Sequence, residues 1–314
     1  MLHVCPAAAA AKLSDALWID LVDPTEEERA EVELATKICL PSKSDIEEIE
    51  SSSRVYAENG GLYFSSPVLE HTDCMSAAVT AAGFVLSHGK LVTQRFGRIA
   101  AFETVMTAVS KAAPSDAGDV FLKLLETIID QLADALEHSS AELERISHAS
   151  FRADHPRRNR AKSSDALRAA LRHLGRMGDG ISHVRDTLLG FGRIAAFLHE
   201  NGNNKFSRGE AARSDAIRAD IASLNDYQLH LSNKVQFLLD ATLGFINIEQ
   251  NDVVKTLTVV SVVGVPPVLV AGIYGMNFKN IPEFDWSFGY PYALILIVAS
   301  GLLPLAWFKW RGWL

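Results

Sequence analysis

Two long stretches without a charged residue constrain the fold of this chain more than any other feature. Residues 256–278 and 286–308 each hold 23 residues with no Asp, Glu, Lys or Arg. A helix of that length spans about 34 Å, enough to cross the hydrocarbon core of a bilayer. Only residues 279–285 separate the two stretches. The sequence therefore predicts a tight hairpin of two transmembrane helices.

The residues at the ends of these stretches predict their orientation. Lys255 precedes the first stretch, and Lys309 and Arg311 follow the second. By the positive-inside rule, both termini are expected in the cytoplasm. No signal peptide is expected, because the alanine run at 7–11 lacks a basic lead-in. Aromatic residues near the span ends suit the membrane interfaces: Trp286, Tyr290, Tyr292, Trp307, Trp310 and Trp313.

Charge and motif content narrow the function of the rest of the chain. The net charge is -8, and nearly all charged residues precede position 256, which predicts an acidic soluble body and argues against a nucleic-acid partner. Cys5, Cys39 and Cys74 form neither a CxxC motif nor a disulfide framework. The chain has no GxSxG, HExxH or GxxxxGK[ST] motif, so an enzyme is not expected.

Alternating strand-like and helix-like segments predict an α/β domain over residues 1–115. Capping boxes are expected at Thr25–Glu28 and at Ser44–Glu47, each opening a helix. Turns are expected at Asn59-Gly60-Gly61 and His88-Gly89. The expected strands cover residues 17–22, 55–56, 62–64, 77–85 and 90–95.

From residue 116 the pattern becomes helical and ends in a long stalk helix. An apolar stripe at three- and four-residue steps begins the region, and a basic cluster at 154–160 interrupts it as a solvated turn. Leu224, Leu231, Leu238 and Phe245 then recur seven apart, a coiled-coil-like seam with no helix breaker after it. The predicted fold is an α+β membrane protein divided into 1–115, a helical region 116–250, a stalk end and first span 251–278, a loop 279–285, a second span 286–308 and a basic tail 309–314.

The residues around the two uncharged stretches resemble a known family. Tyr274-Gly275-Met276-Asn277 ends the first span, Ile281-Pro282-Glu283-Phe284 fills the loop, and Trp286-Ser287-Phe288-Gly289-Tyr290-Pro291 opens the second span. This arrangement resembles the CorA family of divalent-cation channels, whose signature is Gly-Met-Asn at this place. Residues 244–251, 18–21, 49–54 and 312–314 are also similar to that family.

The resemblance implies a homopentamer in the cell's inner membrane that takes up Mg²⁺, with the first span lining the pore and the second facing lipid. Gly275, Met276 and Asn277 are expected to form the ion filter, and Lys279 and Glu283 to lie at the pore mouth. Asp220 looks like the stalk-helix acid of a regulatory Mg²⁺ site, so Mg²⁺ would be both substrate and regulator, with no resident cofactor. Two positions depart from the family pattern: Lys279 replaces a common acid, and Gly264 a bulky aromatic.

A row of small or polar residues along one side of the first span is the candidate pore lining. Neutral groups suit an ion that keeps its water, as Mg²⁺ does, although small residues equally suit close helix packing. We expect this row to continue the stalk seam, with Val254, Leu257 and Val265 as a hydrophobic constriction and Pro266-Pro267 kinking the helix. The row is Asn251, Val254, Thr258, Ser261, Val265, Val268 and Gly272.

Three alternatives to a Mg²⁺ channel stay open. Co²⁺ or Ni²⁺ could permeate as hydrated ions. A Zn²⁺ transporter of the same superfamily is disfavoured because zinc prefers nitrogen and sulfur ligands, which the row lacks. A membrane-anchored sensor or scaffold would need no such row at all.

Overall fold

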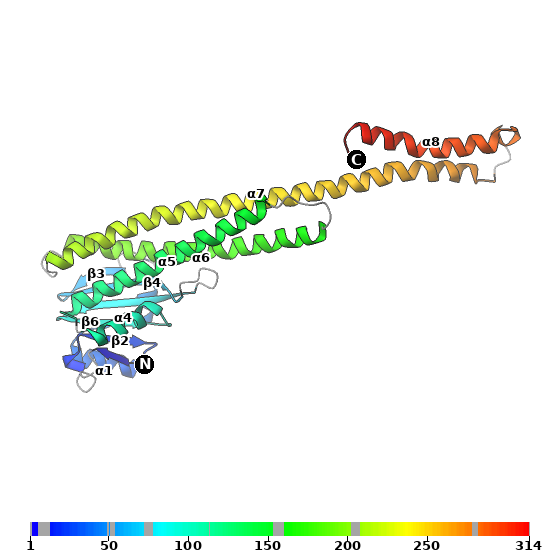
Figure 1. The fold of residues 1–314 in the computed structure, drawn as a ribbon. Helices are drawn as coiled ribbons and strands as arrows, with labels where there is room; N and C mark the ends of the chain where they lie inside the picture. The colour runs from blue at the N-terminus through cyan, green and yellow to red at the C-terminus, as the bar shows by residue number, and fades with distance from the viewer. Residues whose placement is uncertain are drawn as a thin grey trace. The chain divides into compact units, whose positions relative to one another are not determined.

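The computed structural model describes residues 2–5, 13–48, 50, 54–71, 78–112, 114–152, 160–201, 208–277 and 282–313. The chain divides into two compact units (Figure 1). The first comprises Met1–Arg158 and Arg168–Asp240, and the second comprises Asn159–Leu167 and Ala241–Leu314. The basic cluster at 154–160, Cys74 and Lys279 fall outside the described residues, apart from Arg160 at the start of a helix.

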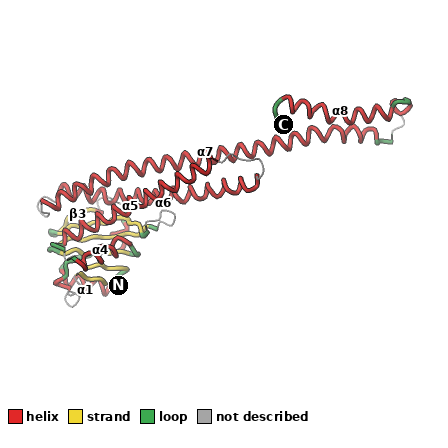
Figure 2. The backbone as a smooth tube through the Cα atoms, viewed as in Figure 1, coloured by secondary structure: helices red, strands yellow, loops and turns green. Residues whose placement is uncertain are grey.

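The first unit is built on a six-stranded mixed sheet, drawn in yellow in Figure 2. Its order is β1-β2-β6-β5-β4-β3, and only the β2–β6 pair is parallel among the described strands. Both predicted turns close hairpins, one between β3 and β4 and the other between β5 and β6. Gly60 and Gly89 in these turns have the positive φ that such turns require, 79° and 70°. The strands are β1 (Leu2–Cys5), β2 (Trp18–Val22), β3 (Val55–Glu58), β4 (Gly61–Leu69), β5 (Val79–Ser87) and β6 (Lys90–Arg95).

Helices cover both faces of this sheet, so successive residues of β2 belong to different cores. Trp18 belongs to the larger core, shared with α4, α5, α6 and α7, whereas Ile19 and Leu21 belong to a smaller core beside α1. This burial on both faces explains why β2 is apolar in nearly every position. The helices are α1 (Glu26–Thr36), α2 (Lys43–Glu47), α4 (Ala100–Lys111), α5 (Ala117–Arg152), α6 (Arg160–Asn201) and α7 (Arg208–Tyr274), with a 3-10 turn at Leu13–Asp15.

One of the two predicted capping boxes is confirmed and the other is displaced. Thr25 and Glu28 form the box that opens α1. The box expected at Ser44–Glu47 is wrong: Ser42 is the N-cap of α2, its N–H donates to Asp45 Oδ2, and its Oγ accepts from the Asp45 N–H. Ser42 lies one residue before the first helical position with extended backbone, whereas Ser44 is already inside the helix.

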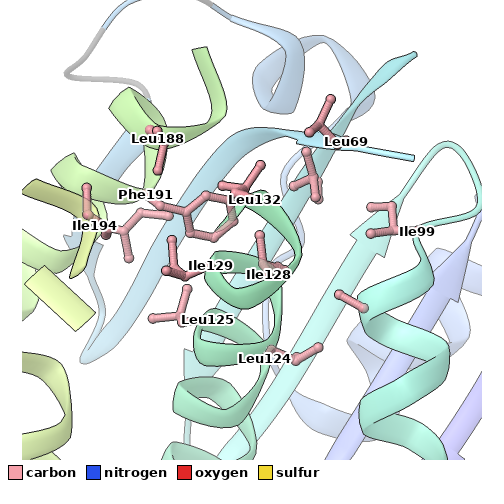
Figure 3. Packing of buried hydrophobic residues seen from close by; sticks show 14 of the residues in the cluster. Leu69, Ile99, Leu124, Leu125, Ile128, Ile129, Leu132, Leu188, Phe191 and Ile194 are labelled. Atoms are coloured by element: carbon pink, nitrogen blue, oxygen red, sulfur yellow. The ribbon is translucent and has the colours of Figure 1, made fainter. Parts of the chain in front are cut away.

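The predicted apolar stripe of α5 forms the centre of the larger core. Leu125, Ile129 and Leu132 lie beside Phe191 of α6 in Figure 3. Every member of the stripe is buried, as is Phe84 of β5, which meets Phe121 edge to face at 5.8 Å. The stripe is Phe121, Leu124, Leu125, Ile128, Ile129, Leu132 and Leu136.

The second unit contains the two helices that the sequence predicts to span a membrane. Helix α7 continues to Tyr274 without interruption at Pro266-Pro267, and α8 spans Gly289–Trp310, with a 3-10 turn at Pro282–Asp285 between them. In the described part of the chain, these two helices are long and apolar enough to cross a bilayer. Their bounds differ slightly from the predicted spans, because a turn at Gly275 ends α7 early and the turn at 286–288 delays α8.

Candidate ion pathway

The first part of the candidate site is the turn that ends α7. Residues 275–277, the Gly-Met-Asn triplet, follow the helix in irregular backbone and are exposed in the single chain. The N–H groups of Gly275 and Met276 donate to carbonyl groups of the preceding helical turn at 2.9 and 3.2 Å. These bonds satisfy carbonyls that a helix end leaves without an intrahelical partner. The Asn277 side chain is therefore presented at the end of a hydrogen-bonded turn.

Where a helix ends beside a pore, a glycine is expected for its permissive backbone dihedrals, and position 275 does not use that freedom. Gly275 is not among the glycines with positive φ, so its backbone does not need the conformational freedom that only glycine has. A Cβ at this position would instead lie 3.1 Å from the carbonyl oxygen of Ala271. The small size of Gly275 is therefore explained by the tight space beside the last helical turn.

The candidate pore-lining row lies on a face of α7 that its own chain leaves uncovered. All of its members are exposed except Thr258, which is half-buried and donates its hydroxyl to Val254 O at 2.8 Å. Leu257, a member of the expected constriction, is also exposed. The exposed members are Asn251, Val254, Ser261, Val265, Val268 and Gly272.

The opposite face of α7 is the one that is covered. Val259 is 9% exposed, and Val263, Pro267, Val270 and Tyr274 are half-buried at three- and four-residue steps after it. With 3.6 residues per turn, this set lies about half a turn around the helix from the candidate row. Packing within the second unit thus separates a covered face from an uncovered one.

The expectation that the candidate row continues the stalk seam is wrong. Leu231 and Leu238 are buried inside the first unit, and seven-residue steps from them lead through Phe245 to Val259. The seam therefore continues into the covered face and not into the row that begins at Val254. A single heptad pattern describes one side of a helix, and the side of α7 that carries the seam packs within the chain. The candidate row lies on the other side, so it cannot continue the seam.

A close contact between α7 and α8 involves a glycine that the sequence patterns alone do not single out. A Cβ at Gly301 would lie 3.2 Å from Cγ of Pro267 and 3.6 Å from the carbonyl oxygen of Val263. Small residues let transmembrane helices approach closely. A glycine in an otherwise bulky apolar helix is the only sequence signal for this contact.

The 3-10 turn at Pro282–Asp285 lies against the start of α8. Glu283 is half-buried in the 3-10 turn, and Trp286 N–H donates to its carbonyl oxygen at 3.4 Å. A Cβ at Gly289 would collide with that same carbonyl oxygen. Gly289 therefore permits the position of Glu283, one of the two residues expected at the pore mouth. The other, Lys279, lies outside the described residues.

The expected regulatory acid lies in the first unit, near other carboxylates. Asp220 is exposed on α7. Burial raises the pKa of Asp130 on α5, and the negative charges of Glu126, Asp134 and Asp220 raise it further. Across the described residues, no three His, Cys, Asp or Glu side chains come together to hold a metal ion. A metal at Asp220 would need ligands from beyond these residues of one chain.

An arginine clamp fastens the start of α7 to α5 near that acidic group. Arg213 donates from Nε and Nη2 to Glu126 at 2.7 and 2.8 Å, and from Nη1 to Asp119 at 2.6 Å. These bonds raise the pKa of Arg213, and the guanidinium lowers the pKa of the Asp119 carboxyl. The bidentate geometry fixes the helix at this point.

Comparisons with known proteins agree with this architecture. The family model described as "CorA-like Mg2+ transporter protein" matches residues 14–310. The magnesium transport protein CorA of Haemophilus ducreyi is 36% identical over 305 residues, covering 96% of this chain and 93% of its own, and that of Escherichia coli K12 is 36% identical over 304 residues with the same coverage. The complete structure of a CorA magnesium transporter from Methanocaldococcus jannaschii matches with a TM-score of 0.76 at 19% identity, covering 95% and 91% of the two chains.

Proposed function

Because this chain belongs to the CorA-like family of Mg²⁺ transporter proteins, we propose that it is a channel for Mg²⁺ uptake whose pore is lined by the uncovered face of α7. Members of this family are transporters and not enzymes, in agreement with the lack of enzyme motifs in the sequence. The observation that carries the proposal is the uncovered, neutral row on α7, which ends one turn before Gly275-Met276-Asn277. Several copies of the chain would bring such rows together around an axis. We propose five copies, as the resemblance to the CorA family implies.

The chemistry of the row favours an ion that keeps its hydration shell. Mg²⁺ loses water reluctantly and is often bound through retained waters. The row holds no carboxylate that would grip a dehydrated cation. A ring of Asn277 amides would offer carbonyl oxygens to the waters of the incoming ion. Co²⁺ and Ni²⁺ would pass by the same contacts if they enter hydrated.

The proposal also includes a driving force and a gate. The membrane potential supplies about 2.3 kcal/mol per charge per 100 mV, twice that for a divalent ion. Val254, Leu257 and Val265 would close the pore by excluding water. Both termini would face the cytoplasm, where Mg²⁺ bound at Asp220 and at groups of a neighbouring chain would favour the closed state.

Mg²⁺ influx into proteoliposomes under an inside-negative potential tests the conduction. Asn277→Ala is expected to abolish selective influx, whereas Val268→Ala, which changes only the size of an apolar lining residue, is expected to keep it. Equal influx through wild-type and Asn277→Ala channels would remove the filter from the proposal. The regulatory part is tested separately: Asp220→Ala is expected to raise the Mg²⁺ concentration needed for closure, and unchanged inhibition would exclude Asp220.

A further inference from the structure

The last turn of α8 carries a group of aromatic and cationic side chains that ion conduction does not use. Trp307, Trp310 and Trp313 are all exposed, and Trp310 is 84% exposed. Lys309 and Arg311 lie among them and are exposed as well. We call these five residues the α8 tail.

The backbone of the α8 tail is a fixed structure. Gly312 N–H donates to Lys309 O at 3.2 Å and Trp313 N–H to Phe308 O at 3.0 Å, with Gly312 at φ 73°. These two bonds are the Schellman motif, which requires a residue that tolerates left-handed backbone. The hydrophobic contact that accompanies this motif is also present, because the rings of Phe308 and Trp313 stack at 5.4 Å. The cap therefore folds Trp313 back onto the helix.

The guanidinium of Arg311 is held in place by a stacked ring and forms no ion pair with any of the residues that the structure describes. Its Cζ lies 5.2 Å from the ring centroid of Trp307, a cation–π distance. Among the ion pairs of the described residues, none involves Lys309 or Arg311, and the sequence has no Asp or Glu after Asp285. Stacking fixes the plane of the guanidinium and leaves its N–H donors for another acceptor. A planar fork of this kind matches the oxygens of a phosphate.

The helix dipole and the membrane interface each account for part of this arrangement. Cations at a helix C-terminus interact favourably with the helix dipole, and indole rings suit a membrane interface of any composition. Neither effect requires an arginine whose guanidinium stacks on one indole and forms no ion pair among the described residues. We propose that the α8 tail binds the phosphate of an anionic phospholipid in the leaflet where this end of α8 lies. Arg311 would hold the phosphate, Lys309 on the other side of the helix would add positive charge at the same depth, and the three indoles would pack against the glycerol and upper acyl region.

Tryptophan quenching by brominated lipids in nanodiscs tests this proposal without any ion flux. In a Trp286→Phe background, the tryptophans near lipid all lie in the α8 tail, since the remaining one, Trp18, is buried in the sheet. A small fixed fraction of brominated phosphatidylglycerol is compared with the same fraction of brominated phosphatidylcholine, in a phosphatidylcholine background. The wild-type tail is expected to be quenched more strongly by the anionic lipid.

The variants separate a built site from general surface charge. Arg311→Gln and Lys309→Gln are each expected to weaken the preference for the anionic lipid about fivefold. Arg311→Lys keeps the charge and loses the stacked fork, so it is expected to fall between wild type and Arg311→Gln. Lys255→Gln is the matched control, because Lys255 already lies 3.9 Å from Asp252, and it is expected to change nothing.

Four results would overturn the proposal. Equal quenching by the two lipids in the wild type would show that no anionic lipid is preferred. An unchanged preference in Arg311→Lys, or an equal loss in Lys255→Gln, would leave only general surface charge. Displacement of the brominated lipid by soluble glycerol phosphate would assign the site to a free phosphate compound. None of these results depends on whether the chain conducts Mg²⁺.

Discussion

Removing one side chain from a buried ion pair in the sheet is expected to destabilise the first unit strongly. Asp20 of β2 and Arg95 of β6 are diagonal neighbours on the parallel strand pair, in which Asp20 is in register with Thr93, and their side chains are 1% and 5% exposed. Arg95 donates from Nη2 and Nε to Asp20 Oδ2 at 2.9 and 3.1 Å, and Thr93 donates to Asp20 Oδ1 at 2.7 Å. Trp18 Nε1 in turn donates to Thr93 at 3.0 Å.

Arg95→Met leaves the Asp20 carboxylate buried with a single neutral donor, Thr93. Breaking a buried pair in this way costs about 3–5 kcal/mol, because the remaining charge keeps its desolvation penalty without its partner. The same change at Arg98 serves as the control. Arg98 pairs with Glu103 at 3.0 Å on the surface, where both side chains are exposed, so Arg98→Met is expected to cost less than about 1 kcal/mol.

Native-state hydrogen exchange on the full-length protein, read by mass spectrometry over β2 and β6, measures the cost locally. A loss of about 3 kcal/mol corresponds to exchange that is more than a hundredfold faster. Adding Asp20→Asn to Arg95→Met removes the stranded charge and keeps an oxygen for Thr93, so part of the protection should return. Exchange that is no faster in Arg95→Met than in Arg98→Met would refute a large cost of stranding the Asp20 charge.

Three further predictions concern the helices. Arg213→Met removes the clamp between α7 and α5 and should weaken their contact by about 1–2 kcal/mol, seen as faster exchange at the start of α7; unchanged exchange would contradict it. Asp130→Asn should stabilise the fold at neutral pH, because the folded state raises the pKa of the Asp130 carboxyl and so disfavours its charged form. At acidic pH the wild-type carboxyl is protonated, and the stability advantage of the variant should vanish. A pH-independent advantage in thermal unfolding would count against this cause. Gly301→Leu should clash with Pro267 and lower the free energy of unfolding by about 1–3 kcal/mol, measured by thermal unfolding. Gly264→Leu should cost less, because the space around Gly264 is open within the chain. The reverse order would be inconsistent with the packing of α8 on α7.

Much of the second unit could be predicted because its signals are local. An uncharged stretch of the right length predicts a spanning helix whatever surrounds it, and the Gly-Met-Asn triplet marks the end of α7 within a few residues. The apolar stripe of α5 is equally readable, since a period of three and four residues is a property of the helix alone.

The missed features depend on contacts between distant segments. The stalk seam and the candidate row are both regular patterns on α7. Seven-residue steps along the sequence lead from the seam to Val259 and not to Val254, but only packing inside the chain shows which of the two faces is covered. The need for a small residue at Gly301 comes from Pro267, 34 positions earlier. Ser42 and Ser44 carry the same capping signal, and the backbone conformation at Ser42 decides between them.

The most direct test of a pore lined by the uncovered face of α7 is Mg²⁺ influx into proteoliposomes that hold a Mg²⁺-sensitive dye, with an inside-negative potential, for wild type and for Ser261→Leu. Ser261 lies on the uncovered row, and a leucine there would narrow a pore lined by that row and exclude water from it. Leucine at Val262, which is also exposed but lies about a hundred degrees further around the helix, is the matched control. Influx in wild type and in Val262→Leu, with little or none in Ser261→Leu, is the predicted result. Undiminished influx through well-folded Ser261→Leu would contradict a pore lined by this face.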